Sequence, residues 1–389
     1  MEQIRYLAEA ERGLTRPLYE ECFPEDSDSF VDYYYREKTR DNRILVMEGP
    51  GSAGAEAGAG IQVMLHLNPF LFRFGRAEQQ LNYIVAVATA PKARKQGRMF
   101  RVMEKALQDM AAQGQPFTFL IPANPRVYAS SGFAFVPEQA GACPEVESEE
   151  TGSVSGQACA CPASGSEETG SAWEQDCACL AAVQEESVSG GHGYLVRPAA
   201  EADMQELAER SNEWLSGMYD VFPLRSPEYM KRLWQELKAQ DGAVLVVTDA
   251  AGEPAGIAAY GREAEKGELQ QMLARPGQER SAERAVREYL AREGMTQVRN
   301  ARMPFMVRLL NLSRMMELMG AVCRKDFCLR VQLEDQILLE NNGCFELYCQ
   351  KGSGGLRPIP EGEAQQRMDA AGLVRELFGR LWLYIREWV

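Results

Sequence analysis

Apolar and polar residues along the first third of the chain follow two different spacings. Short runs that are apolar, or that alternate with polar residues, predict five β-strands, which lie at residues 43–47, 60–67, 81–88, 117–121 and 133–136. Between the third and fourth runs, apolar residues recur every three or four positions and predict one face of an amphipathic helix; they are Met99, Val102, Met103, Ala106, Leu107 and Met110. The pattern predicts a mixed α/β unit with a strand–loop–helix–strand order at its centre.

A second unit of similar order begins near residue 194. Helical spacing at 201–218 and 228–239 is followed by strand-like runs at 243–248, 256–260 and 268–273. A further helical face consists of Ala282, Ala285, Val286, Tyr289 and Leu290. The segment that enters this last helix lacks the basic loop found at the equivalent point of the first unit.

The last part of the chain has the pattern of a third α/β unit. Helical spacing at 307–318 precedes two alternating runs at 329–333 and 345–349, with a turn predicted at 341–343. Apolar helical spacing then runs from 373 to 388. We expect this unit to pack down to its final residues, where chain termini usually fray.

Residues 138–193 differ in composition from the rest of the chain. They contain eleven Asp and Glu residues and neither Lys nor Arg. A Ser-Glu-Glu-Thr-Gly-Ser motif at 148–153 recurs at 166–171, and Cys-Ala-Cys at 159–161 recurs at 177–179. Such a segment buries too little apolar surface to offset the entropy of ordering, which predicts a disordered insert. The cysteine pairs fit a soft-metal site, but duplication of a low-complexity unit gives the same spacing, so no metal is expected.

Composition and charge indicate which class of protein the rest of the chain belongs to. The 389 residues are 45% hydrophobic and 25% charged, and they are too many for one ordinary core. Removing the eleven acids of residues 138–193 from the formal net charge of −14 leaves −3, and no basic patch points to nucleic acid. The first residues form no apolar signal region and no run approaches twenty apolar residues, which predicts a cytoplasmic protein with reduced cysteines.

Candidate chemistry centres on the loop between the strand at 81–88 and the helix that follows it. The loop residues are Arg94, Lys95, Gln96, Gly97, Arg98 and Met99. The free amides of a first helical turn favour an anion, a glycine allows close approach of its backbone, and basic side chains add charge. By itself, the motif also fits a solvated basic turn before a surface helix.

The surroundings of this loop resemble the GNAT acetyltransferases. In that family a Val-x-Thr-x-Pro-x-x-Arg-x-x-Gly segment binds acetyl-CoA, and a Tyr-x-x-x-Gly-Phe segment follows the next strand. Residues 87–97 and 128–133 show the same two patterns here. The resemblance implies that acetyl-CoA is the cosubstrate and that these residues hold it: Val87, Ala88, Thr89, Arg94, Lys95, Gln96, Gly97, Arg98, Met99, Phe100, Ala123 and Asn124.

The order of the three units is similar to that of the enhanced-intracellular-survival (Eis) acetyltransferases. That family combines two GNAT units, the second degenerate, with a C-terminal domain that resembles a sterol carrier protein. The turn at 341–345 and the terminus at 384–389 are similar to the family's Asn-Gly-x-Phe turn and its Ile-Asn-Glu-Ile-Val-type ending, although Arg386 and Trp388 depart from that ending.

The resemblance implies an α/β (α+β) fold in which two mixed-sheet GNAT domains precede a sterol-carrier-protein-like α/β domain. The corresponding boundaries are 1–137 for the first domain, 138–193 for the insert, 194–300 for the second domain and 301–389 for the third. A homo-oligomer, a hexamer in the family, is also implied.

Amide formation from a thioester requires a neutral amine, a stabilised oxyanion and protonation of the leaving thiolate. The resemblance implies that backbone N–H groups at 87–89 bind the thioester oxygen and that Tyr128 is the general acid, since a phenol of pKa about 10 is protonated at neutral pH. From its position alone, Tyr128 also fits a structural role in which its hydroxyl caps a backbone group.

For the general base, the resemblance points to the C-terminal carboxylate of Val389. A free carboxylate has a pKa of about 3.5 and is a poor base, so burial or a relaying water would be needed. An ordinary packed last helix would leave the same apolar ending. Glu387 is a candidate for attracting a cationic amine. The chain has only His66 and His192, so a His-based triad is not expected, and His66 is expected to be a polar or core residue.

The expected function is therefore acetyl-CoA-dependent N-acetylation of a primary amine on a cationic acceptor: an aminoglycoside-like compound, a polyamine or a lysine side chain. No metal, nucleic acid or membrane span is expected. The alternative is a non-catalytic protein that binds a lipid in the sterol-carrier-like domain and retains a vestigial GNAT unit. The intact loop and Tyr128 argue against that alternative.

Overall fold

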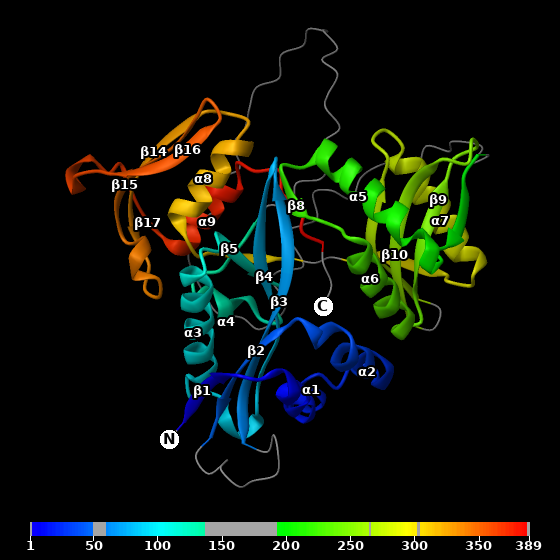
Figure 1. The fold of residues 1–389 in the computed structure, drawn as a ribbon, viewed down its shortest axis with the longest axis horizontal. Helices are drawn as coiled ribbons and strands as arrows, with labels where there is room; N and C mark the ends of the chain where they lie inside the picture. Colours follow the sequence, from blue (N-terminus) through cyan, green and yellow to red (C-terminus); the bar gives the residue numbers. More distant parts are fainter. Residues whose placement is uncertain (1, 50–59, 137–192, 264–265, 302–303, 387–389) are drawn as a thin grey trace, which may run out of the picture. The chain divides into compact units, whose positions relative to one another are not determined.

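The computed structural model describes residues 2–49, 60–136, 193–263, 266–301 and 304–386 (Figure 1). All of these residues belong to one compact unit. Their strands form three separate sheets of eight, five and four strands. The fold is thus an α+β fold with three mixed sheets, as the sequence predicts. Residues 138–192 of the predicted insert (138–193), including its Cys-Ala-Cys pairs, lie outside the described residues, as do Glu387 and Val389.

The eight-stranded sheet carries the first unit of the sequence. Its strands, in spatial order, are β1 (Gln3–Tyr6), β2 (Arg43–Glu48), β3 (Ile61–Phe74), β4 (Ala77–Thr89), β5 (Phe117–Leu120), β13 (Met306–Leu309) and β6 (Ala134–Phe135), and β8 (Val221–Pro223) pairs with β3. The helices of this part of the chain are α1 (Arg16–Cys22), α2 (Asp28–Arg36), α3 (Arg98–Ala112) and α4 (Pro125–Ala129). Strands from all three predicted units therefore contribute to one sheet.

Helix α3 confirms the helical face predicted from the sequence. It packs across β2, β3 and β4, and five of the six predicted residues have no exposed surface: Val102, Met103, Ala106, Leu107 and Met110. Apolar burial of this kind stabilises a helix mainly through packing rather than through intrinsic helix propensity. The sixth residue, Met99, is half-buried where the helix begins.

The five-stranded sheet holds the second unit. Its strands run in the order β12 (Gln297–Asn300), β11 (Lys266–Ala274), β10 (Pro254–Glu263), β9 (Ala243–Thr248) and β7 (Leu195–Pro198). Three helices pack against it: α5 (Met204–Met218), α6 (Pro227–Ala239) and α7 (Glu279–Arg292). The predicted helices and central strands of this unit are all present.

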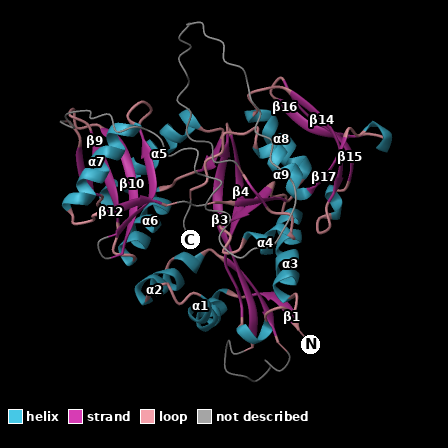
Figure 2. Ribbon diagram, turned by 180° about the vertical axis from the view of Figure 1, so that it is seen from behind, coloured by secondary structure: helices cyan, strands magenta, loops and turns pink. Residues whose placement is uncertain are grey.

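The four-stranded sheet holds the third unit. Its order is β16 (Ser353–Pro358), β15 (Gly343–Gln350), β14 (Phe327–Glu334) and β17 (Gln366–Asp369). Helices α8 (Leu312–Val322) and α9 (Ala370–Phe378) lie beside it (Figure 2). The predicted turn at 341–343 is not a tight hairpin, because eight residues separate the end of β14 from the start of β15 and a short 3-10 helix (Leu339–Asn341) lies within this connection.

Two helix predictions in this unit are wrong in part. Residues 306–309 form β13, which is buried between β5 and β6, and not the start of a helix. Helix α9 ends at Phe378 instead of continuing toward residue 388, and the following chain pairs with β8: the backbone oxygen of Trp382 accepts hydrogen bonds from Asp220 N at 2.7 Å and Val221 N at 3.1 Å. Both segments take partners distant in sequence, which local periodicity does not detect.

Strand β13 is anchored by a buried ion pair. The Arg308 guanidinium donates to both carboxylate oxygens of Asp335, at 2.6 and 2.7 Å, and to the backbone oxygens of Ser131 and Leu309, both at 2.8 Å. Arg308 is 1% exposed and Asp335 is 4% exposed. These contacts join the β5–β6 connection to the segment that follows β14.

None of the helices in the described residues is both long enough and apolar enough to cross a membrane.

Candidate functional site

Strand β4 has an open edge after its midpoint. On one side it pairs with β3 as far as Thr89, opposite Val63, but on the other side its pairing with β5 is confined to Tyr83 and Phe119. The ladder with β3 also contains a bulge, at which Ala86 adopts a φ of 49°. Within the described chain, the β5-facing edge at residues 84–89 therefore has no strand partner, so the backbone N–H groups of this edge are not used in a β-ladder.

The loop after β4 leads directly into α3. A 3-10 turn (Pro91–Ala93) is followed by two residues with left-handed backbone, Lys95 at φ 59° and Gly97 at φ 71°. Gly97 is the N-cap of α3, and a Cβ atom placed on it would meet nothing within 4 Å. A left-handed N-cap with open space above it is a position where glycine is favoured.

The N-terminal amides of α3 are free to bind an anion. The first backbone hydrogen bond of the helix runs from Arg101 N to Gly97 O, at 3.2 Å. The amides of Arg98, Met99 and Phe100 have no partner among the described residues. Free amides and the helix dipole together make this end of α3 suitable for a phosphate group.

The side chains of the loop are less free than its backbone. Arg94 Nε donates to Thr89 O at 3.0 Å, Gln96 donates to Lys92 O at 3.0 Å, and Arg98 pairs with Glu2 at 2.6 Å. The hydrogen bonds from Arg98 and Arg101 lower the pKa of Glu2. Lys95 is exposed and has no ion-pair partner in the described ranges. Of the three basic loop residues predicted to meet phosphate, only Arg98 forms an ion pair within the described residues, and Arg94 is held by the neutral Thr89 carbonyl.

The turn after β5 holds the remaining predicted residues. Ala123 and Asn124 are exposed, and the Asn124 side chain caps α4 by accepting a hydrogen bond from Arg126 N at 3.1 Å. Tyr128 follows in α4 and is 8% exposed, with its ring edge-on to Phe133 at 6.1 Å. Its hydroxyl makes no hydrogen bond to any described residue, so the structure offers no support for a backbone-capping role.

The environment of Tyr128 keeps its hydroxyl protonated. Burial raises the pKa of Tyr128 above its ordinary value of 10.0. Strands β4 and β5 run parallel, and the ends of parallel strands meet at the same edge of a sheet. The α3 amides after β4 and Tyr128 after β5 therefore lie at one edge, so free backbone amides and a protonated phenol share it.

His66 is a buried core residue, as expected. It has no exposed surface, and its Nδ1 lies 2.9 Å from the Tyr34 hydroxyl. Burial lowers the pKa of His66 to about 3, so the imidazole is neutral at physiological pH. It is accordingly a poor proton acceptor for catalysis.

The described chain ends three residues before Val389. Arg386 O accepts a hydrogen bond from Gln271 Nε2 at 2.8 Å, and Tyr384 N donates to Val221 O at 2.9 Å. The terminal segment is thus held by the second unit as far as Arg386.

Comparison with known proteins identifies the first part of the chain. Residues 3–136 match the model of the acetyltransferase (GNAT) domain. These residues include the open edge of β4, the loop before α3, and Tyr128. Through this domain the protein is an N-acetyltransferase. No curated protein sequence matches the chain significantly.

Solved structures match nearly the full length of the chain, at low sequence identity. A GCN5-related N-acetyltransferase from Anabaena variabilis superposes with a TM-score of 0.66 and 14% identity, covering 99% of this chain and 94% of that chain. A GCN5-related N-acetyltransferase from Kribbella flavida gives 0.62 and 15%, covering 98% and 89%. Eis1 from Mycobacterium abscessus gives 0.61 and 12%, covering 97% and 90%. The fold of the whole chain is therefore similar to that of these proteins.

Proposed function

We propose that this protein transfers the acetyl group of acetyl-CoA to a primary amine of a cationic acceptor, such as an aminoglycoside-like compound, a polyamine or a lysine side chain. The observation that carries the proposal is the group of free amides at the start of α3, directly after the open edge of β4. The pyrophosphate of acetyl-CoA would bind these amides, and the thioester oxygen would accept from the backbone at Val87, Ala88 or Thr89.

Tyr128 and Val389 complete the proposed reaction. The amine attacks the thioester carbonyl, the C–S bond breaks, and the Tyr128 hydroxyl gives its proton to the departing CoA sulfur. The C-terminal carboxylate of Val389 takes the proton that the amine loses. The raised pKa of Tyr128 supports the first assignment, because the phenol is then a proton donor throughout the physiological range. The second assignment rests on resemblance to the Eis acetyltransferases.

A pair of glycine substitutions tests the cofactor site. Gly97 and Gly114 stand on either side of α3, with φ of 71° and 74°, and a Cβ atom on either would meet nothing within 4 Å. Gly97→Ala and Gly114→Ala should therefore cost similar backbone strain, about 1 kcal/mol each. Only Gly97→Ala should weaken acetyl-CoA binding, because its methyl group would occupy the approach to the free amides.

The measurement is the rise in melting temperature with acetyl-CoA for both variants and the parent protein. Ligand stabilisation is expected for the parent and for Gly114→Ala, and a much smaller one for Gly97→Ala. No stabilisation of the parent at millimolar acetyl-CoA would reject the proposed cosubstrate. Equal stabilisation of the two variants would show that the phosphates of acetyl-CoA do not bind near Gly97.

A further inference from the structure

A cavity of about 490 Å³ lies between α6, the β3–β4 hairpin and the segment at Lys38–Asp41. We call it the α6 pocket. Its position follows from the strand pairing of β3: β2 pairs with β3 as far as Leu67, and β8 joins it at Phe72. On that side, residues 68–71 have no strand neighbour in the described chain. The pocket occupies the resulting gap, with α6 as its opposite wall.

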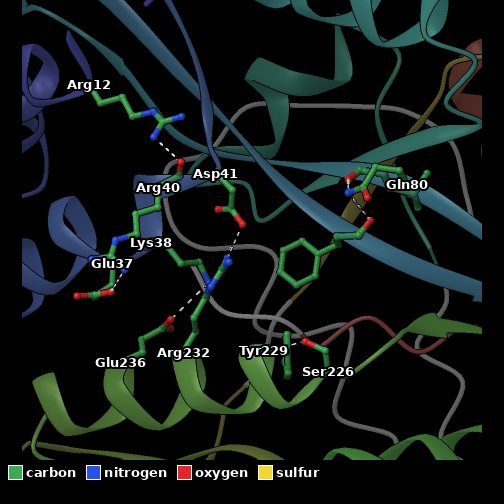
Figure 3. Close-up of polar contacts among 12 residues, drawn as sticks. Arg12, Glu37, Lys38, Arg40, Asp41, Gln80, Ser226, Tyr229, Arg232 and Glu236 are labelled. Atoms are coloured by element: carbon green, nitrogen blue, oxygen red, sulfur yellow. Dashed lines mark hydrogen bonds and ion pairs between the residues drawn. The ribbon is translucent and has the colours of Figure 1, made fainter. Parts of the chain in front are cut away.

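The charges around the α6 pocket balance. Four carboxylates and four basic side chains line it. Lys38 lies 3.4 Å from Glu236, Arg232 lies 2.6 Å from Asp41, and Arg73 lies 2.9 Å from Glu78. Figure 3 shows Lys38, Asp41, Arg232 and Glu236 pointing toward one another above α6. A balanced lining of this kind favours a ligand without net charge over a polycation, which would leave the basic groups unfavourably close.

Two deeply buried polar groups at this pocket are incompletely satisfied. Glu236 is 2% exposed, and its Oε2 lies near Lys38 and the Tyr33 hydroxyl, but its Oε1 has no hydrogen-bond partner in the structure as described. Asn68 is 1% exposed, and its Nδ2 has no partner within the same residues. Buried polar groups are normally paired, and each unpaired group therefore needs an explanation. A ligand that supplies one donor and one acceptor would satisfy both.

Part of the pocket lining is apolar. The rings of Phe70 and Tyr229 are 6.3 Å apart in an edge-to-face arrangement, and Leu233 lies beside them in the lining. Phe70 is two residues after Asn68 on β3, so the two side chains share a face of the strand about 7 Å apart. An apolar group therefore fits next to the polar end formed by Asn68 and Glu236.

We propose that the α6 pocket binds a free amino acid with an aromatic or large aliphatic side chain. Its ammonium group donates to Glu236 Oε1, its carboxylate accepts from Asn68 Nδ2 and Lys38 Nζ, and its side chain packs on Phe70 and Tyr229. An α-amino acid carries a donor and an acceptor on the same carbon atom, has no net charge at neutral pH and has an apolar side chain. These three properties complement the lining of the pocket.

This site is separate from the proposed acetyl-transfer point. Asn68 lies opposite Tyr83 in the β3–β4 ladder. Tyr83 precedes Val87 by four residues, about 13 Å along the strand. The proposal therefore does not depend on the identity of the acetyl acceptor.

Calorimetric titration of the full chain with three matched probes tests the proposal. L-Phenylalanine carries both charges, 2-phenylethylamine lacks the carboxylate, and 3-phenylpropanoate lacks the ammonium group. We expect L-phenylalanine to bind at least about tenfold more tightly than either analogue, since each analogue leaves one buried group unpaired. Glu236→Gln and Asn68→Leu should each weaken L-phenylalanine binding by at least about tenfold.

Glu213→Gln is the control variant, because Glu213 is an exposed glutamate elsewhere in the second unit, and it should leave the affinity unchanged. If Glu236→Gln does not fold, Asn68→Leu decides alone. Binding of 2-phenylethylamine as tight as that of L-phenylalanine would overturn the amino acid proposal. So would an absence of binding by all three probes at millimolar concentration, or unchanged affinity in the folded variants. Stabilisation by acetyl-CoA, measured on the same samples, reports on the proposed function independently.

Discussion

Arg308 and Asp335 form a buried ion pair, in which Arg308 Nη2 lies 2.6 Å from Oδ1 and 2.7 Å from Oδ2 of Asp335. The two residues come from different parts of the fold: Arg308 lies in β13 of the eight-stranded sheet, and Asp335 directly follows the last residue of β14 in the four-stranded sheet. Arg308 also binds the Ser131 carbonyl, three residues after Tyr128. The pair therefore connects the third unit to the segment that carries the proposed general acid.

Breaking this pair should destabilise the protein strongly. Arg308→Met leaves the Asp335 carboxylate buried without its counter-ion, and we expect a loss of about 3–5 kcal/mol in the free energy of unfolding. Asp335→Asn removes the charge but keeps the oxygen that accepts hydrogen bonds from Ile337 N and Leu338 N. In a protein that already carries Asp335→Asn, Arg308→Met should therefore lower the free energy of unfolding by less than it does in the parent protein. Urea denaturation of the three variants gives the coupling energy.

Arg210→Met is the matched control for this cycle, since Arg210 pairs with the exposed Glu213. Its expected cost is below about 1 kcal/mol. If Arg308→Met is as mild as Arg210→Met, the buried pair does not hold β13 in place.

Tyr128→Phe should lower turnover without weakening acetyl-CoA binding. The substitution removes only the hydroxyl, which makes no hydrogen bond to any described residue, so the fold should be unaffected. Loss of a general acid reduces kcat by about 10²–10⁴-fold. Steady-state kinetics with thiol release as readout, together with the acetyl-CoA Kd, separates the two effects. Tyr348→Phe, in the four-stranded sheet, is the control, and unchanged kcat in Tyr128→Phe would remove this residue as the acid.

Extending the chain beyond Val389 should abolish acetyl transfer. Two added glycines would move the terminal carboxylate away from its proposed position as general base, while the contacts of Tyr384 and Arg386 with the second unit would be retained. The same two residues added before Met1 provide the control. Full turnover by the C-terminally extended protein, with its melting temperature unchanged, would show that another group accepts the amine proton.

The buried His66 should make stability depend on pH in the mildly acidic range. Its pKa is about 3 in the folded protein and 6.5 in the unfolded chain. The unfolded chain therefore binds a proton below pH 6.5 that the folded protein does not, and stability falls as the pH falls. Between pH 6.5 and pH 5 the expected loss is about 2 kcal/mol.

His66→Gln, which keeps a polar partner for the Tyr34 hydroxyl, should remove most of this dependence. Denaturation curves at pH 7, 6 and 5 for both proteins make the comparison. If the stability of both proteins changes equally with pH, the pKa of His66 is not lowered by folding.

Local sequence patterns were sufficient to predict the elements that bury one face against elements close to them in sequence. The α3 face and the loop with Gly97 were found because helical spacing, glycine and basic residues are adjacent in sequence. The same reasoning failed for residues 307–309, where apolar residues on both sides of Arg308 suit a helix or a strand equally well until β5 and β6 supply hydrogen-bond partners. It also gave no sign of Arg308, since a single arginine among apolar residues has no pattern that marks it as buried.

The sequence by itself determined the position of the strand–loop–helix segment and the tyrosine after the next strand, because these depend on residues close together in the chain. Only the tertiary structure decided that β13 completes the first sheet, that Asp335 neutralises Arg308, and that Glu236 and Asn68 line one pocket. Each of these relationships joins residues more than twenty positions apart. Their geometry is set by strand pairing and by the need to pair buried charges, which act once the chain has folded.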